Sequence, residues 1–175
     1  EAEENIKLIA KSYLYKDILQ YQNIKNPNIL EKLLQSLALQ VGNEVSYNEL
    51  SNFLDIDKKT VANYIEILKK AFVIFELKPF SRNLRNELRK LRKIYFFDNG
   101  VRNALINNFN SLDRRNDAGQ LWENFIISER VKINSNHGND CNMYFWRTHD
   151  KKEIDYLEEK NGKLYGYEIK LGSGR

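Results

Sequence analysis

The chain has 175 residues, 42% of them hydrophobic and 30% charged, which suffices for one ordinary domain or two small ones with packed cores. No apolar run approaches the roughly 18 residues of a membrane span, and no secretory signal is present. A lone cysteine, Cys141, excludes an internal disulfide and a cysteine-based zinc site, so we expect a cytoplasmic protein without membrane contact. The start at Glu1 without methionine indicates a fragment of a longer chain.

The net charge of +4 is distributed unevenly along the sequence. Residues 1–57 carry 5 basic and 9 acidic side chains, and residues 111–175 carry 11 of each. Residues 58–110 carry 12 basic and 4 acidic side chains, an excess of 8 positive charges. The middle third is therefore the part expected to meet a polyanionic partner.

The N-terminal part predicts helices separated by short turns. Residues 5–20 follow a helical pattern, and residues 1–20 are expected to be a helical lead-in from a preceding domain. After Pro27, apolar residues at helical spacing predict a second helix over about 30–41, which Gly42 ends.

Two shorter helices follow, each with a recognisable start signal. Ser46, with Glu49 three residues later, forms the pattern of a capping box. Asp57 is expected to cap the next helix, which runs to about Phe72. Helices joined by turns this short predict a helix-turn-helix arrangement.

Two apolar segments after these helices, residues 72–80 and 93–100, are typical of strands that return on each other. Together with the preceding helices they predict a winged helix over residues 21–110. In such domains the second helix of the pair lies in the major groove of DNA, with its N-terminal residues nearest the bases. On that helix the expected DNA contacts are Lys58, Lys59 and Asn63, and near the wing they are Arg82, Arg85, Arg89 and Arg92. The alternative is a protein-interaction module whose basic run is only solvated.

The last third predicts a buried helix and a hairpin. Residues 117–133 are apolar on more than one side, which favours a helix packed between layers. Strands are expected over residues 142–148, 152–159 and 162–171, and Asn161-Gly162 is a strong hairpin signal.

The hairpin register follows from that turn. If Asn161 and Gly162 form it, Asp155 falls opposite Glu168 and Glu153 falls opposite Lys170, all on one face. Like charges directly opposed across strands are destabilising, unless a divalent cation lies between them. Mg²⁺ or Mn²⁺ would prefer such carboxylates, and an adjacent lysine would hold a water or stabilise transition-state charge.

Asp155, the E-x-K of Glu168 and Lys170, and the helical Glu123 in LWENF resemble the PD-(D/E)XK nuclease-like core. That resemblance implies metal binding by Asp155 and Glu168, catalysis by Lys170 and completion of the site by Glu123. Ile154 stands where the proline of the motif would be, a departure from the pattern.

The whole chain resembles the C-terminal half of a prokaryotic AAA-type ATPase family. The residues that carry this second resemblance include YLYKDI, KIYFFDNGVRNAL, GQLWENFIISE and YFWRTHDKKEIDYL. It implies that ATP binds only in an N-terminal half not contained here, because no P-loop motif occurs in the chain.

The expected fold class is therefore α/β (α+β), with a winged helix-turn-helix followed by a shortened restriction-endonuclease-like domain over residues 111–175. The expected function is a DNA-associated module of the ATPase with a Mg²⁺-dependent phosphodiester-cleaving site. The alternative is a non-catalytic DNA- or protein-binding regulatory module on an inactive nuclease fold. The sequence leaves the oligomeric state open.

Overall fold

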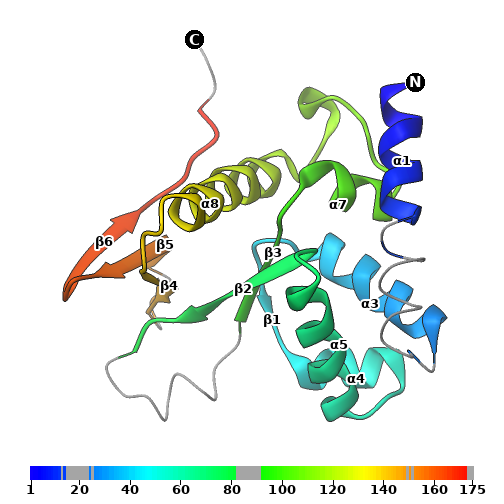
Figure 1. Cartoon of the computed structure of the whole chain (residues 1–175), viewed down its shortest axis with the longest axis horizontal. Helices are drawn as coiled ribbons and strands as arrows, with labels where there is room; N and C mark the ends of the chain where they lie inside the picture. Colours follow the sequence, from blue (N-terminus) through cyan, green and yellow to red (C-terminus); the bar gives the residue numbers. More distant parts are fainter. Residues whose placement is uncertain are drawn as a thin grey trace.

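A computed structural model gives the fold of the chain. It describes residues 1–12, 14, 24, 26–81, 92–148, 150 and 152–172. Within these ranges the protein is a mixed α/β structure with six α-helices and one six-stranded sheet (Figure 1). None of the described helices has the length and hydrophobicity needed to cross a membrane.

Helices and strands are interspersed along the chain. The helices are α1 (Ala2–Ser12), α3 (Pro27–Leu39), α4 (Tyr47–Leu54), α5 (Lys58–Lys70), α7 (Asn99–Leu105) and α8 (Ala118–Asn136), with a short 3₁₀ turn at Leu112–Arg114. The strands are β1 (Glu44–Val45), β2 (Ile74–Pro79), β3 (Arg92–Phe96), β4 (Asn142–Arg147), β5 (Glu153–Lys160) and β6 (Lys163–Tyr167). The sheet order is β1-β3-β2-β4-β5-β6.

The helix start signals of the N-terminal half are confirmed. The Ser46 hydroxyl accepts a hydrogen bond from the Glu49 N–H at 3.4 Å, and Asp57 Oδ1 accepts from the Thr60 N–H at 2.9 Å. Each cap satisfies one of the unpaired N–H groups at a helix start. The caps therefore set where α4 and α5 begin.

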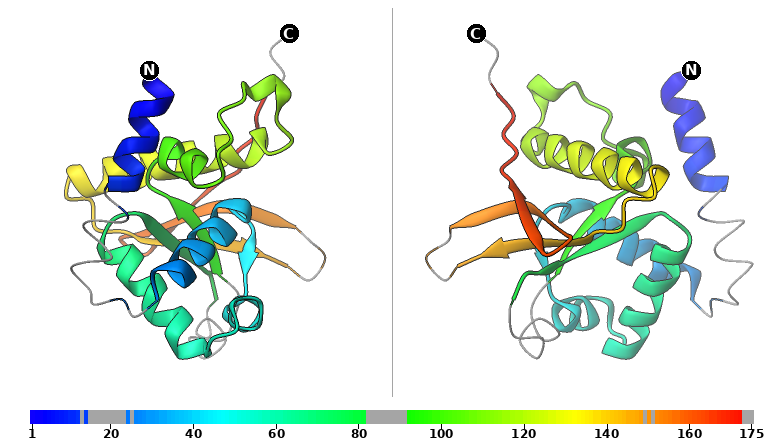
Figure 2. Two further views of the ribbon diagram at one scale, coloured as in Figure 1. Left: turned by 90° about the vertical axis from the view of Figure 1, so that its right-hand side faces the viewer. Right: turned by 60° about the vertical axis from the view of Figure 1, so that its left-hand side comes forward.

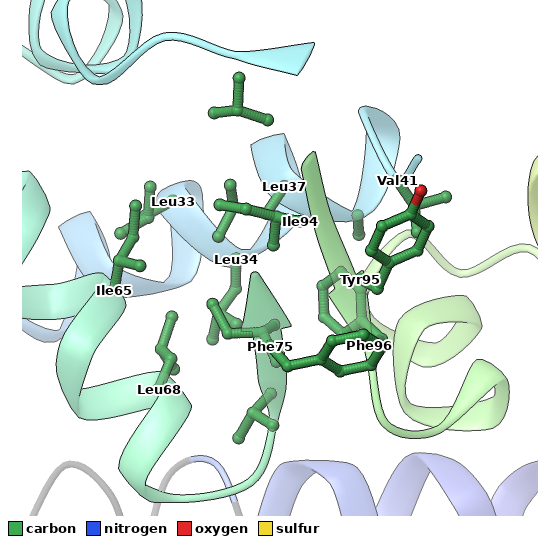
Figure 3. Packing of buried hydrophobic residues seen from close by; sticks show 14 of the residues in the cluster. Leu33, Leu34, Leu37, Val41, Ile65, Leu68, Phe75, Ile94, Tyr95 and Phe96 are labelled. Atoms are coloured by element: carbon green, nitrogen blue, oxygen red, sulfur yellow. The ribbon is translucent and has the colours of Figure 1, made fainter. Parts of the chain in front are cut away.

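The core of the N-terminal half lies between the helices and the first three strands. Figure 3 shows leucines of α3 facing Ile65 and Leu68 of α5, with Phe75, Ile94 and Phe96 of the sheet beside them. All of these side chains are buried. Burial of this apolar surface is the main force that holds the helices on the strands.

One sheet joins both halves of the chain. β2 pairs antiparallel with β3, and on its other side it pairs parallel with β4, where Lys78 lies opposite Tyr144. The Phe80 N–H also donates to the Phe145 carbonyl at 2.7 Å. α7 and α8 lie on one side of this sheet, and α4 and α5 lie on the other (Figure 2). The boundary predicted between residues 110 and 111 stays a prediction.

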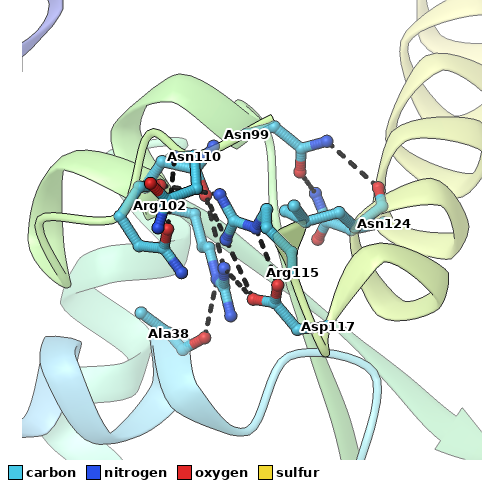
Figure 4. Close-up of polar contacts among 10 residues, drawn as sticks. Ala38, Asn99, Arg102, Asn110, Arg115, Asp117 and Asn124 are labelled. Atoms are coloured by element: carbon cyan, nitrogen blue, oxygen red, sulfur yellow. Dashed lines mark hydrogen bonds and ion pairs between the residues drawn. The ribbon is translucent and has the colours of Figure 1, made fainter. Parts of the chain in front are cut away.

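A buried ion network ties α3 to the segment before α8 (Figure 4). Arg102 of α7 donates through Nε to the Ala38 carbonyl at 2.7 Å and through Nη1 to Asp117 Oδ2 at 2.6 Å. Arg115 donates to both oxygens of Asp117, at 2.7 and 2.9 Å. The hydrogen bonds from Arg115, which have the largest effect, and from Arg102 lower the pKa of Asp117 to about 2.

Candidate functional site

A polar pocket lies where the two halves meet. It has a volume of about 620 Å³ and is lined by side chains of β1, β3, α8, β4, β5 and the segment after β6. Its charged lining includes Lys93, Glu123, Glu153, Asp155 and Lys170. Three of the four residues expected to be catalytic, Glu123, Asp155 and Lys170, are therefore brought to one pocket.

The hairpin that carries Asp155 has the predicted turn and register. Asn161 and Gly162 take left-handed backbone angles, with φ of 52° and 72°. The β5–β6 pairs run from Lys160 opposite Lys163 to Tyr156 opposite Tyr167. Positive φ at both turn residues is the geometry of a type I′ turn, one of the two favoured two-residue hairpin loops.

A β-bulge lies on the β4 side of β5, next to Asp155. Tyr144 pairs with Leu157 and Trp146 pairs with Ile154, so one residue of β4 faces two residues of β5, Asp155 and Tyr156. Such a bulge re-aims a side chain relative to the regular alternation of a strand. Glu153 and Asp155 nevertheless line the same pocket, as the alternation of strand side chains predicts.

The paired part of the β5–β6 hairpin ends one pair before Asp155 and Glu168, so the predicted opposition of these two side chains stays a prediction. The β5–β6 ladder ends at Tyr167, and the Ile169 N–H instead donates to Asp155 Oδ2 at 2.8 Å. Glu168 lines a neighbouring pocket and forms an exposed ion pair with Lys170, Oε1 to Nζ 2.8 Å. The hydrogen bond of this pair raises the pKa of the Lys170 ammonium.

Glu123 extends from α8 into the pocket and is held by two donors. The Tyr95 hydroxyl donates to Glu123 Oε1 at 2.6 Å, and Lys93 Nζ lies 3.4 Å from the same oxygen. Burial raises the pKa of Glu123, and the Asp155 charge raises it further, whereas Lys93 and Tyr95 oppose the rise. A Cβ on Gly42 would lie 3.4 Å from Glu123 Oε1, so the backbone approaches this carboxylate closely.

Lys93 is a site residue that the sequence pattern does not reveal. It ends the basic stretch between the two predicted wing strands, but its side chain is only 5% exposed, and its Nζ lies 2.5 Å from Glu153 Oε1. The available signal is the spacing of Lys93 and Tyr95, which share one face of β3 because strand side chains alternate. Burial of that face could not be read from the charge pattern.

The nuclease-like resemblance implies that acidic groups of this pocket bind a divalent cation. Among the described residues, no group of three or more histidine, cysteine, aspartate and glutamate side chains is arranged to hold a metal ion. Glu168, one of the two expected metal ligands, does not line the pocket. Binding of Mg²⁺ or Mn²⁺ therefore stays a prediction.

The residues expected to contact DNA fall into three groups. Lys58, Lys59 and Asn63 are exposed on α5, the first two in its opening turn. Arg92 is mostly buried: its Nε lies 3.4 Å from Glu76 Oε2, and its guanidinium lies 5.5 Å from the Tyr47 ring centroid. Outside the described residues lie Arg82, Arg85 and Arg89.

Several proteins of different organisms are similar to the chain. An uncharacterized protein of Mycobacterium tuberculosis is 32% identical over 139 residues, which cover 78% of the chain and 31% of that protein. An uncharacterized protein of Haemophilus influenzae is 26% identical over 161 residues, which cover 89% of the chain and 37% of that protein. The chain thus spans about a third of the length of these relatives. No solved structure matches the chain significantly.

Two family models match successive parts of the sequence. Residues 118–175 match a domain of unknown function, DUF4143, which is found in C-terminal regions associated with AAA ATPases. Residues 1–112 match a second domain of unknown function, DUF8612. Because this second model covers more than half of the sequence, the chain belongs to the DUF8612 family.

Proposed function

We propose that the chain is a DNA-binding, non-catalytic regulatory module of an AAA-type ATPase. Its likeness to the ATPase-associated domain over residues 118–175 supports the ATPase part. The relatives are about 2.5 times as long as the chain, which leaves room for an ATPase domain in the same protein. ATP would then bind to that other domain and not to residues 1–175.

The element order supports a winged helix in the N-terminal half. α3, β1, α4, α5, β2 and β3 follow one another, and β1, β3 and β2 form an antiparallel group within the sheet. In this arrangement α5 is the recognition helix, capped by Asp57 and anchored on the core through Val61, Ile65 and Leu68. Its outward face is then available to a partner.

The exposed start of α5 is the main observation in support of DNA binding. Lys58 and Lys59 stand in its opening turn and Asn63 lies one turn further along, all exposed. Lysines there would contact phosphates, and a side-chain amide can read an adenine edge. Arg92 contributes less, because Glu76 and Tyr47 already hold its guanidinium.

The test is binding of a fluorescent DNA duplex, followed by anisotropy at several salt concentrations. Lys58→Glu with Lys59→Glu should weaken binding and lower the salt slope by about two, one for each lost phosphate contact. Lys32→Glu with Lys163→Glu is the matched control, because it changes the net charge equally at exposed sites on α3 and β6. Equal loss of binding in both variants would refute a specific role of α5.

The non-catalytic part rests on how the acidic groups of the pocket are paired. Asp155 accepts a backbone N–H, Glu123 accepts the Tyr95 hydroxyl, and Glu153 pairs with Lys93. Carboxylates that already have fixed donors are less available as metal ligands.

Metal-dependent phosphodiester cleavage is the second candidate, because Glu123, Asp155 and Lys170 line one pocket. Incubation of the protein with DNA and Mg²⁺ or Mn²⁺ separates the two candidates. Cleavage that is lost in Asp155→Ala and in Lys170→Ala would favour the second. Absence of cleavage, with intact DNA binding, would favour the first.

A further inference from the structure

One ammonium group lies between the carboxylates of the polar pocket. Lys93 Nζ is 2.5 Å from Glu153 Oε1 of β5 and 3.4 Å from Glu123 Oε1 of α8. The same nitrogen lies 5.6 Å from the centroid of the Phe145 ring of β4. With 5% of its side chain exposed, Lys93 meets acceptors and an aromatic face instead of solvent.

The surroundings make this ammonium a fixed part of the pocket. An ammonium removed from water is stable only when carboxylates and a polarisable surface replace its hydration. In return, the Lys93 charge offsets the burial of Glu123, whose pKa would otherwise rise further. The charges of Lys93 and Glu123 therefore stabilise each other, and removing either one leaves the other uncompensated in the pocket.

We propose that the Lys93 ammonium occupies the place of a divalent cation in this pocket and excludes one from it. The Lys93 charge bridges the carboxylates of Glu123 and Glu153, the role that a hard metal ion would take among oxygen ligands. Glu153 has a second, more distant cation, since its Oε2 lies 3.9 Å from Arg147 Nε at the edge of the pocket. A divalent cation in this pocket would lie beside the buried positive charge of Lys93, and the repulsion between the two would strongly oppose its binding. This inference deepens the non-catalytic part of the proposed function and rests on it.

Lys93 is consequently not part of the DNA-binding charge of the middle third. It lies in β3 next to Arg92, but the two side chains point to different partners: Arg92 pairs with Glu76, and Lys93 pairs with Glu153 and Glu123. Neighbouring strand residues project to opposite faces, which accounts for this separation.

The test is a calorimetric titration of the full 175-residue chain with Mn²⁺. We expect Lys93→Met to bind Mn²⁺ about tenfold more tightly than the wild type, because the variant keeps the carboxylates and loses the competing charge. Lys163→Met is the control, since it removes an equal charge from the exposed hairpin and should bind like the wild type. Adding Glu123→Gln to Lys93→Met should cancel the gain in Mn²⁺ affinity.

A second measurement covers the case in which Lys93→Met is poorly folded. Mn²⁺ should then raise the melting temperature of the variant, or restore its far-UV circular dichroism, while leaving the wild type unchanged. Equal Mn²⁺ affinity in the wild type and the variant, or no effect of Mn²⁺ on the fold of the variant, would overturn the inference. Mn²⁺-dependent DNA cleavage by the wild type would instead remove the proposed function, so the two failures are distinguishable.

Discussion

Arg102 is almost fully buried, with 2% of its surface exposed, and its charge depends on Asp117. Asp117→Asn removes the negative charge that Arg102 and Arg115 share and leaves two buried guanidinium groups uncompensated. We expect a loss of about 3 kcal/mol in the free energy of unfolding, measured by urea denaturation. Asp113→Asn is the control: its ion pair with Arg114 spans 3.8 Å at the surface, and its loss should cost less than about 0.5 kcal/mol.

The same carboxylate predicts how stability depends on pH. The pKa of Asp117 is about 2 in the folded chain and 3.8 in the unfolded reference, so the folded state favours the ionised form. Its contribution is present above about pH 4 and is lost as the pH falls towards 2. Urea midpoints of the wild type and Asp117→Asn should therefore converge as the pH falls from 5 to about 2. A constant difference over this range would contradict the assignment.

At the scale of elements, replacing glycine by alanine at two positions tests how the backbone of the β5–β6 turn affects stability. Gly162 has φ of 72°, and a Cβ at this position would meet no atom within 4 Å, so Gly162→Ala should cost about 1 kcal/mol through the backbone alone. Gly119 has equally open surroundings but lies in α8 without a positive φ, so Gly119→Ala should stabilise by about 0.5 kcal/mol. Denaturation midpoints that shift in the same direction for both variants would refute this explanation.

At the scale of the whole molecule, the shared sheet predicts a single cooperative unfolding transition. The β2–β4 pairing joins the two halves, and Asn124 of α8 exchanges hydrogen bonds with the backbone of Phe96 in β3 at 2.8 and 3.0 Å. Trp122 and Trp146 report on the C-terminal half, whereas far-UV circular dichroism is dominated by helices of both halves. The two signals should give coincident transitions. An earlier transition in fluorescence would show that the halves unfold separately.

The sequence by itself determined the features that depend on neighbours along the chain. The capping residues Ser46 and Asp57 begin their helices as predicted, and Asn161-Gly162 sets the hairpin register from Lys160 to Tyr156. These signals are local, because a cap or a two-residue turn is completed within about four residues. The long apolar helix around Glu123 is likewise recognisable from its pattern.

Only the tertiary structure decided which charged groups meet in the pocket. The burial of Lys93 depends on Glu123 of α8, Phe145 of β4 and Glu153 of β5, which all lie far away in sequence. A charge pattern cannot show whether a lysine faces solvent or a buried carboxylate. That choice depends on which surfaces the packing of distant elements removes from water, and this is set by the fold as a whole.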